Sequence, residues 1–218
     1  MLDLLLPSRC VVCSRSGPLV CDACRRSVFP VRSPLCACCG APTEWPVLRC
    51  IECSGRRLGF ASARAAVVYT GSTRVLVRAW KERGLRPLAA LAAELVVAAV
   101  PRPSADVITY IPPDGDRSLK RGHHPARRLA HELAARWELE EQALLRRTRA
   151  VSQQTGLSRI ERRRNVRGAF VATGAVPANV VLVDDVYTTG ATVGAAASAL
   201  RAAGAGRIDV VTFARAVR

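Results

Sequence analysis

The chain has 218 residues, half of them apolar, which is enough for one ordinary α/β domain and a small additional domain. Its net charge is +16, with 31 Arg against 2 Lys. This charge favours a polyanionic ligand or partner, although a genomic composition bias also produces an excess of Arg. No apolar run approaches the roughly 20 residues of a membrane span, and the MLDLLL start is too short and too poor in positive charge for a signal peptide. We therefore expect a cytoplasmic protein.

All nine Cys lie within residues 10–53, and eight of them form C-x-x-C pairs. The pairs are Cys10/Cys13, Cys21/Cys24, Cys36/Cys39 and Cys50/Cys53. Two thiolates at this spacing can share a tetrahedral zinc ion, and a second pair completes the site. The short intervals favour two sequential four-cysteine sites, a double zinc ribbon; a cross-braced arrangement, first pair with third and second with fourth, is the alternative. Because four sulfur ligands leave no open position, we expect about two structural zinc ions and no catalytic one.

A linker is expected at residues 55–59, which divides the chain into a zinc-ribbon domain (1–58) and a second domain (59–218). In the second domain, strand and helix patterns alternate. Strands are expected at 64–69, 106–111, 144–147, 169–172, 180–183 and 208–214, and helices at 72–83, 87–100, 125–137 and 191–203. Such alternation is typical of an α/β fold with a mostly parallel sheet that helices cover on both faces.

The stretch from Val180 to Thr192 predicts the functional site. Four apolar residues read as a strand buried on both faces, and Asp184 and Asp185 close it. The Thr/Gly loop and Ala-rich helix that follow place a polar site at the carboxyl end of a strand, where open α/β sheets bind ligands. The loop amides suit a phosphate, whereas adjacent carboxylates repel phosphate and accept hydrogen bonds from vicinal hydroxyls. A ribose 5-phosphate offers both groups; a capped helix without a ligand is the alternative.

This stretch resembles the phosphoribosyl pyrophosphate (PRPP) motif of type I phosphoribosyltransferases. The resemblance implies that the acidic pair holds the ribose 2- and 3-hydroxyls, that the loop wraps the 5-phosphate, and that Mg²⁺ accompanies PRPP. The residues implied in PRPP binding are Asp184, Asp185, Val186, Tyr187, Thr188, Thr189, Gly190, Ala191 and Thr192.

Two basic stretches are candidates for binding the diphosphate of PRPP. The first follows the strand that ends at Pro113, and the second runs from Ser152 to Phe170. Cations help a diphosphate to leave when they lie where its charge develops, and a closing loop excludes water. The diphosphate and lid candidates are Lys120, Arg121, Gln154, Arg162 and Arg163. A solvated helical face is the alternative for both stretches, and the surplus Arg residues also suit single-stranded DNA.

The motifs follow one another in the order of the ComF family, and the resemblance covers essentially the whole chain. The shared features are the Cys pairs, a Lys-x-x-Gly segment, an Arg-Gly element, the segment from Gln154 to Phe170 and the PRPP motif. The chain departs from many members at residues 121–125, Arg-Gly-His-His-Pro instead of Arg-Gly-Phe-Asn-Gln, so those contacts are not carried over. A His pair on a loop is more often on the surface than catalytic.

The resemblance to ComF implies a type I phosphoribosyltransferase-like fold and a role in natural transformation, the handling of incoming single-stranded DNA. A DNA-uptake helicase or recombination proteins are the implied protein partners. We expect a PRPP-binding protein that acts in DNA uptake, although its few aromatic residues limit base stacking. The alternative is a phosphoribosyltransferase that transfers phosphoribosyl from PRPP to an unknown acceptor and releases diphosphate.

Overall fold

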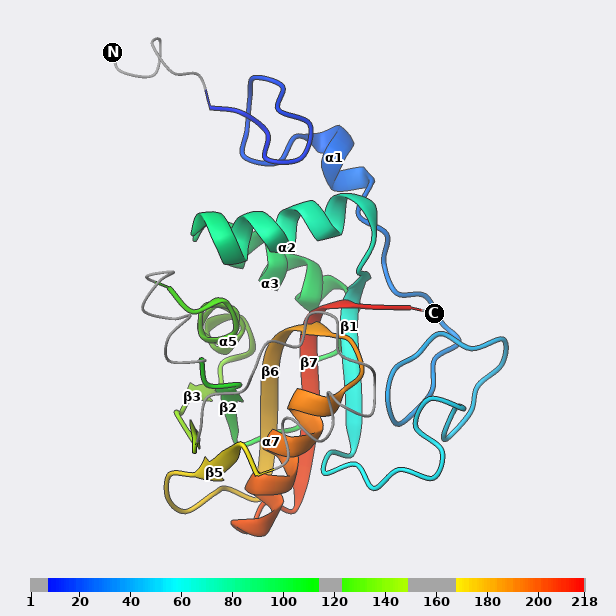
Figure 1. The fold of residues 1–218 in the computed structure, drawn as a ribbon, viewed down its shortest axis with the longest axis vertical. Helices are drawn as coiled ribbons and strands as arrows, with labels where there is room; N and C mark the ends of the chain where they lie inside the picture. The colour runs from blue at the N-terminus through cyan, green and yellow to red at the C-terminus, as the bar shows by residue number, and fades with distance from the viewer. Residues whose placement is uncertain (1–7, 114–122, 149–167, 218) are drawn as a thin grey trace.

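A computed structural model of the protein describes residues 8–113, 123–148 and 168–217. Its centre is a five-stranded parallel sheet with the order β1-β7-β6-β2-β3 (Figure 1). In chain order the strands are β1 (Ser62–Val68), β2 (Val107–Tyr110), β3 (Glu140–Glu141), β6 (Asn179–Tyr187) and β7 (Arg207–Arg215). The long central strands β6 and β7 lie side by side, so the acidic pair belongs to the most deeply buried strand pairing of the sheet.

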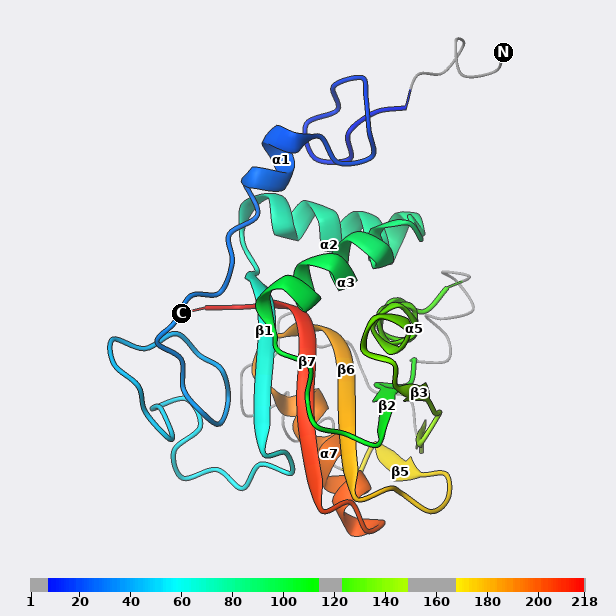
Figure 2. The same ribbon diagram turned by 180° about the vertical axis from the view of Figure 1, so that it is seen from behind.

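Helices cover both faces of the sheet, as Figures 1 and 2 show from opposite sides. One face packs against α2 (Gly71–Arg83), α3 (Leu88–Ala99) and α5 (Pro125–Trp137), and the other packs against α7 (Ala191–Ala202). Neighbouring residues of β6 alternate between the two cores, so a strand of continuous apolar residues fills both. The predicted fold class, an α/β fold with a helix-flanked parallel sheet and a small Cys-rich N-terminal region, is confirmed.

The structure differs from the predicted elements in three places. First, β6 does not end at the acidic pair but continues to Tyr187, because Val186 and Tyr187 pair with the last residues of β7. Second, β4 (Leu145–Arg147) and β5 (Phe170–Ala172) form a separate antiparallel pair. Third, β3 and the single-turn helix α1 (Asp22–Arg26) have no predicted counterpart, because elements this short show no periodicity.

The Cys-rich segment reaches both faces of the sheet. Val11 and Val28, near the first two Cys pairs, pack in the core beneath α2 and α3. Residues 29–31 then run along the free edge of β1, where Val31 N–H donates to the carbonyl of Ala66 (2.9 Å). The last two Cys pairs lie beyond that edge and join the core beneath α7. In the described residues, no helix is both long enough and apolar enough to cross a membrane.

Candidate functional site

The acidic pair sits near the carboxyl end of β6, opposite the last turn of α2. Lys81 of that turn forms an ion pair with Asp185, with Nζ and Oδ1 2.8 Å apart. The Asp185 side chain is 11% exposed and that of Lys81 is 31% exposed, so water screens the pair only partly. Asp184 accepts the backbone N–H of Asp185 at its Oδ1 (2.9 Å). Two carboxylates and one ammonium therefore form a compact cluster at this edge of the sheet.

Burial and the neighbouring charges shift the pKa values of this cluster. Burial and the charge of Asp185 raise the pKa of Asp184 to about 7, although Lys81 opposes the rise. Burial disfavours the charged form of Lys81, but the carboxylates of Asp185 and Asp184 outweigh it and raise the lysine pKa. Lys81 thus stays cationic, while Asp184 exchanges a proton near neutral pH. A carboxyl group of this kind is typical of functional sites.

The loop after β6 leads directly into α7, and the N-cap residue of that helix, Gly190, has no side chain that could cap it. Gly190 adopts the left-handed region, with φ at +68°. A Cβ at this position would lie 2.2 Å from the hydroxyl oxygen of Tyr187, so any other residue would have to displace this buried side chain. Thr189 is buried, and its Oγ1 accepts the N–H of Ala191 (3.3 Å). No acid lies in the first turn of α7, and a helix N-terminus of this kind suits a phosphate.

Two histidines precede α5 near the cluster, and only the first of them is buried, in contrast to the surface position expected for the pair. His123 is buried, with its Nε2 2.6 Å from the carbonyl oxygen of Trp80. His124 precedes α5 and packs edge-on against Tyr110, with ring centroids 5.4 Å apart. Burial lowers the pKa of His124 to about 4, although the charge of Asp185 opposes the shift. His124 is therefore neutral at pH 7.

The structure brings together part of the predicted site and adds two cations. The PRPP motif residues 184–192 are all described, whereas the diphosphate and lid candidates lie outside the described residues; these are Lys120, Arg121, Gln154, Arg162 and Arg163. The sequence did not single out Lys81 for the site, although its place in a Lys-x-x-Gly segment was a signal. Arg147 was missed as well: its charge lowers the pKa of Asp184, and its Nε donates to the carbonyl of Pro112 (3.0 Å).

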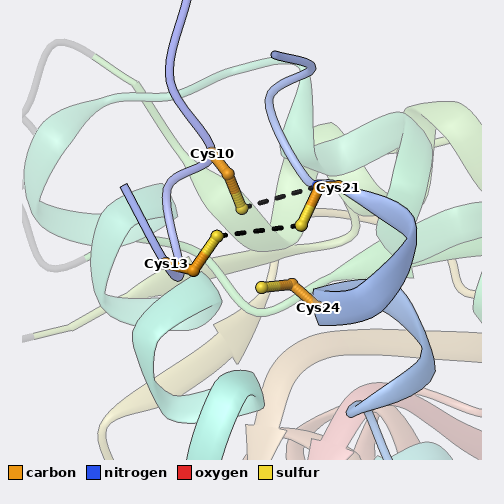
Figure 3. A group of neighbouring side chains, drawn as sticks. All are labelled: Cys10, Cys13, Cys21 and Cys24. Carbon is orange, nitrogen blue, oxygen red and sulfur yellow. Dashed lines mark hydrogen bonds between the residues drawn. The ribbon is translucent and has the colours of Figure 1, made fainter. Parts of the chain in front are cut away.

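The eight paired Cys form two groups, and the grouping is sequential. The first group is Cys10, Cys13, Cys21 and Cys24 (Figure 3), and the second is Cys36, Cys39, Cys50 and Cys53. Within each group all sulfur atoms lie within 4.8 Å of one another. Zn–S bonds of about 2.3 Å would place tetrahedral sulfurs about 3.8 Å apart. The sulfur–sulfur distances fit: 3.7 Å for Cys13–Cys21, 3.6 Å for Cys36–Cys53 and 3.5 Å for Cys39–Cys50.

Zinc is thus the metal that both groups fit, and no disulfide competes for the sulfurs, since all nine Cys are free. Cys38 is buried but belongs to neither group. Its backbone carbonyl accepts a hydrogen bond from the N–H of Ala63 in β1 (2.8 Å). Cys38 therefore helps to join the second group to the sheet.

Comparisons with known proteins agree with this architecture. A family described as "Double zinc ribbon domain" matches residues 1–54. The DNA utilization protein YhgH of Salmonella typhi is 30% identical, over 97% of this chain and 99% of that protein. Its counterpart in Salmonella typhimurium strain LT2 is 31% identical with the same coverage. Competence protein F of Haemophilus influenzae is 26% identical over 95% of this chain and 97% of its own length. With relatives this similar over nearly its whole length, and a double zinc ribbon before a helix-flanked parallel sheet, the chain belongs to the ComF family.

Proposed function

We propose that this protein binds PRPP at the carboxyl end of β6 and acts in DNA uptake, in the handling of single-stranded DNA during natural transformation. The cluster of Lys81, Asp184 and Asp185 beside the start of α7, where the N-cap residue is Gly190, is the observation that carries the PRPP assignment. The role in DNA rests on the relatives, which are named for DNA utilization and for competence and match this chain over nearly their whole length. The net charge of +16 suits a nucleic-acid partner.

The parts of PRPP match the parts of this site. The amides of residues 188–192 suit the 5-phosphate, since a helix N-terminus carries a partial positive charge. Asp184 and Asp185 suit the ribose hydroxyls, because ionised carboxylates accept such hydrogen bonds strongly. Lys81 lies 2.8 Å from Asp185 and offsets part of the negative charge of the acidic pair. The Mg²⁺ expected with PRPP would neutralise part of the charge on its diphosphate.

Calorimetry with Mg²⁺ and PRPP tests this assignment. Asp184→Asn with Asp185→Asn keeps the shape of the side chains but removes two charged acceptors. We expect the affinity to fall by about 10- to 150-fold per lost hydrogen bond. Asp106→Asn is the matched control: Asp106 lies at the other end of the same strands, where its Oδ2 accepts the N–H of Asn179 (2.9 Å). Equal affinity in the wild type and the double variant would rule out the assignment.

The pH dependence of the affinity isolates Asp184. Because its pKa in the folded protein is about 7, Asp184 loses its charge as the pH falls below 7. A protonated carboxyl is a weaker acceptor, so the affinity of the wild type for PRPP should weaken between pH 8 and 6. PRPP has phosphate groups that titrate in this range too, but they act equally on Asp184→Asn. The difference between the wild type and Asp184→Asn should therefore shrink as the pH falls; a constant difference would contradict this role of Asp184.

Phosphoribosyl transfer is the second candidate function, and the pKa of Asp184 favours it. A carboxyl group with a pKa of about 7 can take up or give a proton at working pH, as a general base or acid does. Diphosphate release from PRPP, measured with a panel of acceptors, tests for turnover. The same assay with and without single-stranded DNA separates the two functions: an acceptor that supports turnover without DNA favours the enzyme of nucleotide metabolism. PRPP binding without turnover favours the DNA-handling protein.

A further inference from the structure

Arg215, the last residue of β7, is a buried cation between the second four-cysteine site and the PRPP loop. Its side chain is 2% exposed. Its Nη1 donates to the carbonyl oxygen of Cys39 (2.5 Å), and its Nη2 lies 3.8 Å from the sulfur of the same residue. Nη2 also pairs with Oε2 of Glu52 at 3.0 Å. A charge is seldom buried so completely unless its partners compensate for the lost hydration, and here the partners belong to the second Cys ribbon.

The other side of the Arg215 guanidinium faces the loop. Its Cζ lies 4.5 Å from the ring centroid of Tyr187, the last residue of β6, in the geometry of a cation–π contact. Tyr187 is buried as well. Its hydroxyl occupies the space that a side chain at Gly190 would need, so the tyrosine supports the left-handed turn from below. A chain of direct contacts thus runs from Cys39 through Arg215 and Tyr187 to Gly190.

We propose that Arg215 is a positioning residue that couples the second four-cysteine site to the phosphate-binding loop. This inference rests on the proposed function, since it assigns Arg215 a part in shaping the PRPP pocket. Four thiolates around one zinc ion carry more negative charge than the metal compensates. Arg215 is therefore drawn to Cys39, and in that position it holds Tyr187 beneath Gly190. Because such coupling is reciprocal, a ligand bound at the loop must then change the surroundings of the sulfurs in the second site.

Among the residues that the structure describes, the first four-cysteine site has no such connection. In the described residues, its sulfur contacts stay within the site: Cys13 with Cys21, and the N–H of Cys21 with Cys10. A purely structural role for Arg215, as an anchor for the end of β7, is the competing explanation. It predicts that changes of Arg215 lower the stability of the protein, and that a ligand at the loop has no effect on the second site.

Three variants distinguish these two explanations, and all of them retain the eight Cys that would bind zinc. Arg215→Met removes the charge but keeps the length, Arg215→Lys keeps the charge without the planar fork, and Tyr187→Phe removes only the hydroxyl. Hydrogen exchange without any ligand is the first readout. We expect the amides of residues 188–191 to exchange about tenfold faster in Arg215→Met, with partial rescue in Arg215→Lys. Amides in the middle of β6 should keep their protection, and the zinc content should not change.

The second readout is spectroscopic. With Co²⁺ in place of zinc, the thiolate–metal absorption reports on the surroundings of the sulfurs. Addition of PRPP should change this absorption in the wild type, and not in Arg215→Met. PRPP affinity, measured by calorimetry, should fall about tenfold or more in the same variant.

The outcomes are distinguishable from a failure of the proposed function. If the wild type does not bind PRPP, that function fails, while the ligand-free exchange experiment still decides about the coupling. If Arg215→Met folds and the amides of residues 188–191 exchange hydrogen at the wild-type rate, the proposed coupling is overturned. If Arg215→Met loses protection throughout β6, the other two variants, Arg215→Lys and Tyr187→Phe, decide the question. Faster hydrogen exchange confined to the loop amides of these variants supports the coupling, and unchanged exchange of those amides overturns it.

Discussion

The two four-cysteine sites contain the same ligands at similar spacings but have different surroundings. In the first site Cys13 is exposed, and none of the four Cys belongs to either hydrophobic core. In the second site Cys36, Cys39 and Cys53 are buried and belong to the core beneath α7. Figures 1 and 2 agree with this difference: the first ribbon projects beyond α2, and the second lies alongside the edge of the sheet.

The bonds that join each ribbon to the rest of the molecule differ in the same way. The first ribbon is joined through side chains: Val11 packs in the core beneath α2 and α3, Arg25 forms an ion pair with Glu94, and the hydroxyls of Ser27 and Ser72 are in contact (2.6 Å). The second ribbon also uses backbone groups: the carbonyl of Ala37 accepts Nη1 of Arg64 (3.0 Å), and that of Cys38 bonds to β1. A metal site that shares a core stabilises the whole domain, whereas a peripheral one stabilises mainly itself.

Removal of each site in turn should have the largest effect. Cys36→Ser with Cys53→Ser takes two fully buried ligands from the second site, and Cys10→Ser with Cys24→Ser takes the corresponding first and last ligands of the first site. Structural zinc contributes about 10–16 kcal/mol in small domains, which is as large as the whole stability of a typical protein, about 5–15 kcal/mol. We therefore expect loss of the second site to abolish the cooperative unfolding of the sheet, followed by far-ultraviolet circular dichroism.

Loss of the first site should instead leave that transition in place, with the zinc content lowered from about two ions to one. Metal analysis of the same samples checks that each pair of substitutions empties only its own site. Equal damage from the two double variants would show that the ribbons are equivalent, whatever their burial.

Two glycines give a smaller and more local test of the comparison. Gly40 of the second ribbon adopts φ +70°, and a Cβ there would lie 2.2 Å from the carbonyl oxygen of Ala63 in β1. Gly17 of the first ribbon also has a positive φ, but a Cβ there would meet nothing within 4 Å. Both Ala variants carry backbone strain, whereas only Gly40→Ala must push its ribbon away from the sheet. We expect Gly40→Ala to lower the free energy of unfolding by about 1–3 kcal/mol more than strain alone.

Gly55→Ala measures that strain, because Gly55 has φ +67° and open space around it. Denaturant titrations of the three variants give the comparison. A Gly40→Ala protein no less stable than Gly55→Ala would mean that the second ribbon is not held tightly against β1.

The sequence predicts the layers of this fold well because buried strands and helices show characteristic patterns of apolar residues. Continuous apolar strands and Ala-rich helices alternate along residues 62–215, so the parallel sheet and its two helical layers could be read from composition and spacing. C-x-x-C spacing likewise predicts zinc ligands, because the spacing itself brings two sulfurs together. The division into residues 1–58 and 59–218 stays a prediction.

The sequence does not show which side chains meet across the layers. Lys81 and Asp185 are 104 positions apart, and Cys39 and Arg215 are 176 positions apart (185 − 81 and 215 − 39). No local pattern marks such pairs; they arise from how α2 and the second ribbon dock on the sheet. For the same reason the spacing of the Cys pairs could not reveal that only the second site has Cys ligands within a hydrophobic core. The extension of β6 past the acidic pair also depends on a partner, the long strand β7.

The ion pair that joins each ribbon to the sheet domain gives the smallest test, and the two pairs are matched. In the first ribbon Arg25 pairs with Glu94, whose side chains are 42% and 56% exposed. In the second ribbon Glu52 pairs with Arg215, whose side chains are 21% and 2% exposed. Glu94→Gln should cost less than about 1 kcal/mol, as exposed ion pairs do. Glu52→Gln should cost about 1.5–3 kcal/mol, because it takes a charged partner from a guanidinium that has little access to water.

Ionic strength separates the two pairs further. Salt screens charges that face solvent and affects buried pairs much less. In denaturant titrations with urea, the small effect of Glu94→Gln should therefore vanish in about 1 M NaCl, where the screening length is about 3 Å. The effect of Glu52→Gln should persist, because the Arg215 guanidinium is shielded from the added ions. If both effects are small and both vanish with salt, the second ribbon is held by its backbone hydrogen bonds and its core contacts, and the charge of Glu52 contributes nothing to its position.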